Sequence, residues 1–379
     1  MGYIKGIPYI ILWFSSIFAG YAGFFCPLLP LMFISNKWYR RVTDFLLTFW
    51  QMYPSALLEF IHGCDIHVTG DAINADENIL LVMNHRTRTD WNYLWPAVSK
   101  ATIGRNRWMY PTKFVLKDPI RHVPGVGWMM QLGSYLYIKR HWEEDQIKMA
   151  KAIDFFTELN TKFSLLIFPE GTDLTPQTKA NSDRFADKMG LPHYDHVLHP
   201  RTTGFCYLAK KMLEKGTLDA IYDATIVYVD KTPQNEKSLV NGNVPKHICI
   251  HFKRYNYGEF NASEQSLQKF LETRWSEKEA LLADFQSSDR RTLYDSKMEM
   301  RVRPYTRNFL LALIFWTLLP FPVGYFLYTC PTFRYIVIAH TIFLLSVNIL
   351  SDGFQSVEIG VHESKKRVRR LFVHEHHDN

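Results

Sequence analysis

A histidine and an aspartate five residues apart are the first candidates for chemistry in the sequence. His85 and Asp90 belong to the segment Asn84-His-Arg-Thr-Arg-Thr-Asp90, which follows the apolar run Ile79–Met83 and precedes a segment of helical character. Across a strand-to-helix turn, the carboxylate could hold one imidazole nitrogen and leave the other free to accept a proton. The pair predicts a general base with its orienting group, although a surface histidine beside a helix-capping aspartate would have the same spacing.

This pair lacks the serine that would complete a hydrolytic triad. An enzyme whose acceptor substrate supplies its own hydroxyl needs only to deprotonate that hydroxyl as it attacks a thioester. The pattern therefore indicates direct transfer to an acceptor rather than a covalent enzyme intermediate.

Three further segments at the ends of apolar runs carry candidate binding residues. In Phe168-Pro-Glu-Gly-Thr172, a tight turn would present Glu170, Gly171 and Thr172 to a ligand, although such turns are often only structural. Tyr137-Ile-Lys-Arg140 places Arg140 where a guanidinium could grip a phosphate, and the alternative is a solvated surface cation. Arg201 lies in Val197-Leu-His-Pro-Arg-Thr-Thr-Gly204, which could also be an ordinary turn before a helix.

Short apolar runs that alternate with helical stretches must position these residues. The runs are rich in β-branched and aromatic side chains, and they predict an α/β domain with a mostly parallel sheet flanked by helices. Reactive residues are expected at the carboxyl ends of its strands. The expected strands are Ile66–Thr69, Asn78–Met83, Ser134–Ile138, Phe163–Phe168, Ala224–Val229 and His247–Phe252.

Long uncharged segments at both ends of the chain predict membrane spans. Ile7–Ile34 exceeds the roughly 20 residues that cross a bilayer, and a cleaved signal peptide fits less well because its apolar region is shorter. Near the C-terminus, two segments, 308–333 and 335–351, predict a transmembrane hairpin that turns near Thr329-Cys-Pro-Thr332. The segment Asn36–Phe60 predicts a helix that either lies in the membrane interface or packs under the domain.

The formal charge of +7 is concentrated beside these spans, which favours a membrane surface over nucleic acid as the partner. By the positive-inside bias, the central domain and the tail are expected to face the cytosol. Five scattered cysteines predict neither a disulfide framework nor a zinc site. The basic residues that set the orientation are Lys37, Arg40, Arg41, Arg301, Arg303, Arg307, Lys365, Lys366, Arg367, Arg369 and Arg370, against Lys5 and Arg334 on the other side.

Together, the four segments and the spans resemble the glycerolipid acyltransferase family, which includes 1-acylglycerol-3-phosphate acyltransferases. The resemblance covers about residues 80–210 by motif. It implies that His85 is the general base, that Asp90 orients it, and that Arg140 binds phosphate. It also implies a substrate-binding role for Glu170, Gly171, Thr172 and Arg201, and for Lys113 ahead of the turn Pro124-Gly-Val-Gly127.

One position departs from the family pattern. The third motif commonly reads Phe-Pro-Glu-Gly-Thr-Arg, whereas residue 173 is aspartate here, and an anion beside a phosphate site should weaken binding of a phosphate monoester. The segment Phe168–Thr175 is similar to the branch that contains lysocardiolipin and lysophosphatidylinositol acyltransferases. The resemblance thus implies acyl-CoA as co-substrate, a lysophospholipid acceptor with lysophosphatidic acid less favoured, no cofactor or metal, and an endoplasmic reticulum membrane.

The expected organisation is a membrane segment and helix over residues 1–60, a catalytic domain over 61–300, the hairpin over 301–352 and a basic cytosolic tail over 353–379. Three other functions stay open. A transacylase would use a phospholipid donor without acyl-CoA, and a membrane scaffold would not need the His85 and Asp90 pair. A metal hydrolase would use His85 with the tail residues His374, His376 and His377, but the tail lacks a matching second cluster.

Overall fold

The computed structural model describes residues 2–233, 235–259, 263–287 and 306–375. Arg301, Arg303, His376 and His377 lie outside these ranges, so the structure does not test what was expected of them. The chain forms two compact units that alternate along the sequence. The first comprises Met1–Trp13, Thr48–Thr112 and Lys162–Ile314, and the second comprises Phe14–Leu47, Lys113–Thr161 and Phe315–Asn379.

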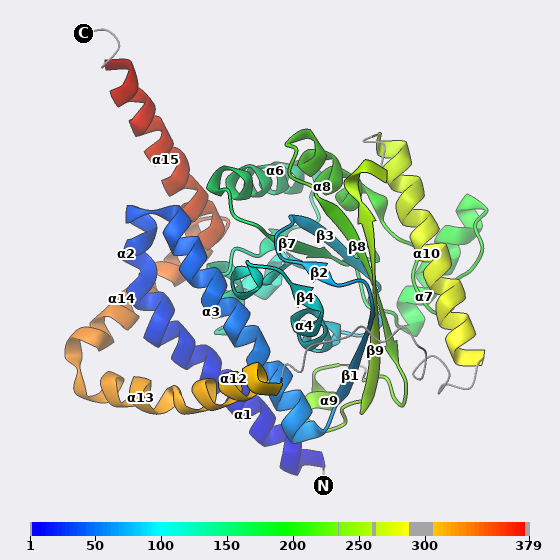
Figure 1. Cartoon of the computed structure of the whole chain (residues 1–379), viewed down its shortest axis with the longest axis horizontal. Helices are drawn as coiled ribbons and strands as arrows, with labels where there is room; N and C mark the ends of the chain where they lie inside the picture. The colour runs from blue at the N-terminus through cyan, green and yellow to red at the C-terminus, as the bar shows by residue number, and fades with distance from the viewer. Residues whose placement is uncertain (1, 234, 260–262, 288–305, 376–379) are drawn as a thin grey trace. The chain divides into compact units, whose positions relative to one another are not determined.

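The first unit contains the expected sheet (Figure 1). Its strands pair in the order β1-β9-β8-β3-β7, and all pairs are parallel except β8 with β9. Every residue of β3 is buried, as expected for a strand that is covered on both faces. The strands are β1 (Asp65–Gly70), β3 (Ile79–Met83), β7 (Ser164–Ile167), β8 (Ala220–Tyr228) and β9 (His247–Asn256), and a separate two-stranded pair joins β2 (Ile73–Asn74) to β4 (Thr102–Ile103).

The helix that carries Asp90 is held by an aromatic cluster within the first unit. As expected, α4 (Asp90–Ala101) begins at Asp90. The ring of Trp91 stacks on Trp13, with 5.5 Å between the centroids, and Trp95 packs edge-on against Trp50. Because Trp13 belongs to α1 (Gly2–Gly20) and Trp50 to α3 (Asn36–Leu57), both N-terminal helices fix the position of α4.

Two further helices of the first unit pack on each other: α10 (Glu264–Ser287) contacts α8 (Thr202–Glu214) through the stacked rings of Phe270 and Phe205. The buried ammonium of Lys278 in α10 forms an ion pair with Asp223 of β8 and donates to Ala224 O at 2.6 Å. This unit also contains α7 (Pro176–Met189) and the short helix α9 (Lys237–Val240).

The second unit contains a further parallel pair, β5 (Thr112–Lys117) and β6 (Leu136–Ile138). β6 was expected, whereas β5 was missed because its apolar run of three residues lies between two lysines. Two buried ion pairs anchor the first half of α3: Arg40 with Glu358 at 2.7 Å and Lys113 with Asp44 at 2.6 Å. One face of α3 thus packs against protein, while Trp38 on the same helix is exposed, so a position of α3 in the membrane interface stays a prediction. The helices of the second unit include α2 (Cys26–Ile34), α5 (Val126–Leu132), α6 (Trp142–Leu159) and α15 (Phe354–Glu375).

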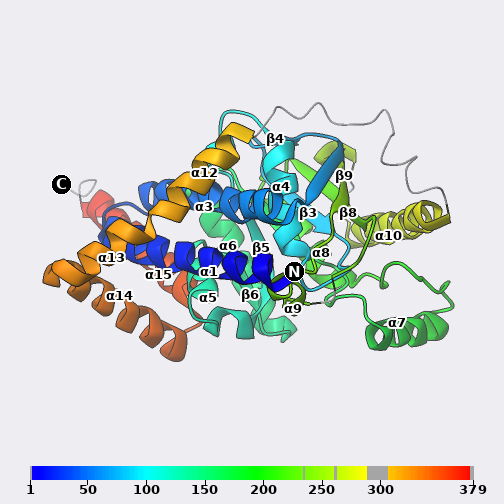
Figure 2. The same ribbon diagram turned by 90° about the horizontal axis from the view of Figure 1, so that it is seen from below.

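Among the described residues, three helices are long and apolar enough to cross a membrane: Tyr3–Ile34, Arg307–Thr329 and Pro331–Leu350. The first joins α1 and α2 through a π-helical turn, and the second joins α12 (Thr306–Leu318) and α13 (Pro320–Thr329). Helix α13 ends at Thr329, Cys330 is extended, and α14 (Pro331–Leu350) begins at the next residue, so the expected hairpin turn is confirmed (Figures 1 and 2). These helices indicate an integral membrane protein.

Candidate active site

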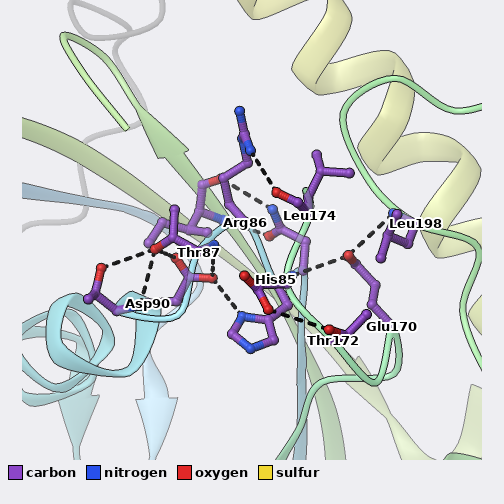
Figure 3. Close-up of polar contacts among 12 residues, drawn as sticks. His85, Arg86, Thr87, Asp90, Glu170, Thr172, Leu174 and Leu198 are labelled. Atoms are coloured by element: carbon purple, nitrogen blue, oxygen red, sulfur yellow. Dashed lines mark hydrogen bonds and ion pairs between the residues drawn. The ribbon is translucent and has the colours of Figure 1, made fainter. Parts of the chain in front are cut away.

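His85 and Asp90 meet at the carboxyl end of β3, as their spacing predicts. His85 Nδ1 lies 3.0 Å from Asp90 Oδ2, and within the described residues His85 Nε2 has no hydrogen-bond partner (Figure 3). The histidine side chain is 19% exposed, whereas the aspartate is completely buried. The geometry leaves one imidazole nitrogen available to a substrate proton.

Asp90 is held by more than the histidine. Its Oδ2 also accepts from the backbone N–H of Thr87 at 3.0 Å, and its Oδ1 accepts from the hydroxyls of Thr87 at 3.0 Å and Tyr228 at 2.6 Å. This set of donors satisfies both oxygens of the buried carboxylate and holds it in one rotamer. Asp90 is therefore suited to orient the imidazole and to stabilise it when it is protonated.

The charge distribution makes His85 a stronger base. Burial alone lowers its pKa, but the hydrogen bond and charge of Asp90, with smaller contributions from Glu170 and Asp173, outweigh burial and raise the pKa above its ordinary value. The ring of Phe168 stacks on the imidazole with 4.3 Å between the centroids, which restricts the tilt of the ring.

Glu170 ties three segments together at this end of the sheet. Its Oε1 accepts from the backbone N–H of His85 at 3.2 Å, and its Oε2 accepts from the backbone N–H of Leu198 at 3.3 Å (Figure 3). The indole of Trp275 also donates to Oε1, at 3.2 Å. Burial raises the pKa of this carboxyl to about 7, while His85 and the N–H donors oppose the shift. Glu170 thus fixes the backbone of His85, and its contact with an acceptor stays a prediction.

The turn after β7 carries Gly171 and Thr172, and it lies against the segment of Arg201. Gly171 has φ +73°, a conformation that favours glycine, and a Cβ added there would lie 3.4 Å from Arg201 Cδ. The backbone N–H of Arg201 donates to Pro169 O at 2.8 Å, and that of Leu174 donates to His85 O at 2.9 Å. Thr172 and Arg201 therefore lie on segments that are hydrogen-bonded to the histidine segment or to each other.

The acyltransferase family matches residues 65–229, and the acyltransferase C-terminus family matches residues 238–316. Lysocardiolipin acyltransferase 1 of Gallus gallus is 36% identical over 97% of this chain and 97% of its own length. The chain belongs to the acyltransferase family. Lysophosphatidylinositol acyltransferase 10 of Caenorhabditis elegans is 36% identical over 80% of each chain.

A crystal structure of the 1-acyl-sn-glycerophosphate acyltransferase PlsC from Thermotoga maritima superimposes with a TM-score of 0.47 at 14% identity, covering 75% of this chain and 98% of that one. The chain is therefore an enzyme of phospholipid metabolism from the family of lysophospholipid acyltransferases. The enzyme assignment replaces the scaffold interpretation.

Two predicted substrate residues belong to the second unit of the acyltransferase. Arg140 is exposed after β6 with φ +65°, and Lys113 is buried, donating to Asp44 Oδ1 at 2.6 Å and to Gly133 O at 2.9 Å. The binding roles of both residues stay predictions. No cluster of three histidine, cysteine or acidic side chains that could hold a metal lies within the described ranges.

Sequence reasoning missed three residues of the acyltransferase site. Thr87 lies between His85 and Asp90, and Tyr228 ends β8, so the rule that reactive groups follow strands could have identified Tyr228. Trp275 gave no signal, because its indole reaches Glu170 from α10, 105 residues further along the chain.

Replacing Tyr228 with phenylalanine should lower kcat about fivefold, since one hydrogen bond to the buried carboxylate is lost. The loss concentrates negative charge on Asp90 and further raises the pKa of His85, so the acid limb of the kcat profile should move to higher pH. Tyr222→Phe is the matched control, because its hydroxyl lies on the same strand but donates to Ala72 O. An unchanged acid limb in Tyr228→Phe would exclude an electrostatic role for the hydroxyl.

Proposed function

We propose that the protein acylates a lysophospholipid whose head group is joined through a phosphodiester, such as lysocardiolipin or lysophosphatidylinositol, with His85 as the general base. The observation that carries this proposal is the ordered His85–Asp90 pair with an open Nε2. Within the described residues, no protein hydroxyl or thiol is hydrogen-bonded to Nε2 in the position of a nucleophile. The acceptor itself must then supply the attacking oxygen.

The proposed reaction proceeds without a covalent enzyme intermediate. His85 Nε2 takes the proton of the acceptor hydroxyl while the oxygen attacks the thioester carbonyl of acyl-CoA, and Asp90 stabilises the imidazolium. When the tetrahedral intermediate collapses, the carbon–sulfur bond breaks and the thiolate of CoA takes the proton from the imidazolium. The products are the diacyl lipid and free CoA, and His85 returns to its neutral form.

Asp173 supports a phosphodiester acceptor. It is partly exposed two residues after Gly171, and its negative charge acts on His85. A phosphate monoester carries up to two negative charges, a phosphodiester only one, so repulsion by Asp173 selects against the monoester. The two relatives named for lysocardiolipin and lysophosphatidylinositol are equally identical to this chain, so identity does not choose between these acceptors.

We assign Gly171, Thr172 and Arg201 to the acceptor side of the site, and Arg140 to its phosphate. A cavity of about 240 Å³ is lined by residues on both sides of His85, namely Asn84 and Arg86, together with Tyr228, Leu282 and Phe285. Its mixed polar and apolar lining suits an amphiphilic substrate. The basic residues beside the spans support a cytosolic catalytic domain on the endoplasmic reticulum, where acyl-CoA is accessible.

The direct test is acyl transfer by the purified full-length protein in phosphatidylcholine nanodiscs. A panel of lysophospholipids is offered together with a panel of acyl-CoAs, and the products are identified by mass. We expect lysophosphatidylinositol or monolysocardiolipin to be acylated faster than lysophosphatidic acid, and only in the presence of acyl-CoA. A preference for lysophosphatidic acid would contradict the acceptor assignment, and transfer without acyl-CoA would contradict the donor.

Exchanging Asp173 for arginine should move the preference towards the monoester. The charge reversal lies at a partly exposed position, so we expect the rate ratio of lysophosphatidic acid to lysophosphatidylinositol to rise only about three- to tenfold in a mixed-acceptor assay. Asp187→Arg, at an exposed carboxylate of α7, is the matched control and should leave the ratio unchanged. A fall in the ratio for Asp173→Arg would refute the charge argument.

A further inference from the structure

The second unit contains a cavity that none of the acyl-transfer residues lines. Its volume is about 620 Å³, and its walls come from the end of α2, the start of α3, the end of α6 and residues 362–370 of α15. The charged residues of the lining are Lys37, Lys365, Lys366, Arg369, Arg370 and Glu158, with His362 beside them. Five cations against one carboxylate make this cavity strongly basic.

Only part of this positive charge is neutralised by the protein. Glu158 pairs with Lys366 and with His362 Nε2 at 3.0 Å. Lys365 donates to neutral oxygens, Met32 O at 2.7 Å and Asn36 Oδ1 at 2.9 Å. Within the described part of the chain, Lys37, Arg369 and Arg370 form no ion pair. Like charges held together without counterions repel one another, and a bound anion would relieve that repulsion.

The cavity begins where an apolar span ends. Ile34, which lines it, is the last residue of the membrane helix Tyr3–Ile34, and the next helix starts with Asn36 and Lys37. Phe33, Ile34 and Trp38 are exposed by 53%, 75% and 58%, which suits side chains that contact lipid. The boundary between an apolar span and basic residues is the depth of lipid phosphates in a bilayer.

We propose that this cavity binds the phosphate-bearing head group of an anionic phospholipid, through residues other than those assigned to the lysolipid substrate. Arg369 and Arg370 supply guanidinium groups, which suit phosphate oxygens, while Ile34 and Leu159 supply an apolar wall for the glycerol end of the lipid. Burial and the nearby charge of Arg369 lower the pKa of Lys365, which agrees with a crowded cationic site.

The test is native mass spectrometry of the full-length protein in neutral detergent, titrated with dioleoyl phosphatidic acid or with dioleoyl phosphatidylcholine. We expect phosphatidic acid to bind at least about tenfold more tightly than phosphatidylcholine. The triple variant Lys37→Glu, Arg369→Glu and Arg370→Glu should abolish this difference. The matched control Lys188→Glu, Lys210→Glu and Lys269→Glu changes the same net charge at exposed lysines of the first unit and should retain the difference.

Glu158→Gln provides an independent variant with the opposite expected result. Removing the one carboxylate of the lining releases Lys366, so phosphatidic acid should bind about threefold more tightly or better. Weaker binding to Glu158→Gln, or equal loss in both triple variants, would overturn the proposal. Complete displacement of the lipid by millimolar inorganic phosphate would assign the site to free phosphate. The readout is binding, so its outcome does not depend on the proposed acyl transfer.

Discussion

Replacing His85 with alanine should lower kcat for acyl transfer by about 10²–10⁴-fold, because the acceptor hydroxyl loses its general base. The KM for acyl-CoA should change little, since the imidazole acts on the proton of the acceptor. The measurement is the initial rate of CoA release with a saturating lysophospholipid in nanodiscs. His85 follows the carboxyl end of β3 and its side chain is 19% exposed, so its removal should leave the fold intact.

A second histidine–aspartate pair provides the control for this variant. His193 Nε2 lies 2.7 Å from Asp187 Oδ1 on the exposed surface, at the end of α7. His193→Ala removes the same side chain and the same kind of contact, and it should retain the full rate. If His85→Ala kept more than about a tenth of the wild-type rate, His85 would not be the base.

Exchanging Asp90 for asparagine should lower the rate on a similar scale and also change its pH dependence. The maximal rate should fall about 10²–10⁴-fold, because the imidazolium loses its counter-charge and asparagine disturbs the donors from Thr87. Burial lowers the pKa of His85, and the charge and hydrogen bond of Asp90 raise it. Asparagine carries no charge, so in this variant the lowering effect of burial is no longer offset by Asp90. The pKa of His85 should fall, and the acid limb of the kcat profile should move to lower pH.

Together, the pH profiles of two variants separate electrostatics from structural damage. Asp90→Asn should move the acid limb to lower pH, whereas Tyr228→Phe should move it to higher pH. A structural disturbance would lower the rate without opposite shifts of this kind. Asp187→Asn, in the exposed pair, should leave both the rate and the profile unchanged. Shifts of the same sign in both active-site variants would contradict the assigned roles.

The catalytic pair could be predicted from the sequence because its geometry is local. β3 is a continuous apolar run and α4 starts five residues after His85, so a single turn brings the pair together. All six predicted strands are present, because β-branched runs with polar ends give a strong signal. β5 was missed, since buried Lys113 interrupts its pattern and its partner Asp44 is 69 residues away.

The residues that hold Asp90 and Glu170 in place could not be predicted, because they come from distant segments of the chain. Tyr228 donates to Asp90 and Trp275 donates to Glu170, and in each pair the two residues are more than 100 positions apart in the sequence. The alternation of the two units also has no signature in local composition, since it arises where α1, α3 and α12 continue from one unit into the other. Periodicity reports which face of a segment is apolar, and it does not report which distant segment will cover that face.

The contacts of α10 set a lower limit on the length of a catalytic fragment of this chain. A fragment cut after residue 229, at the end of the first family match, would contain His85, Asp90 and Tyr228. It would lack Trp275, which holds Glu170, and Lys278, which neutralises buried Asp223. An unpaired buried carboxylate destabilises a fold by about 3–5 kcal/mol. Engineering or grafting of this site therefore has to carry α10 along with the residues that perform the chemistry.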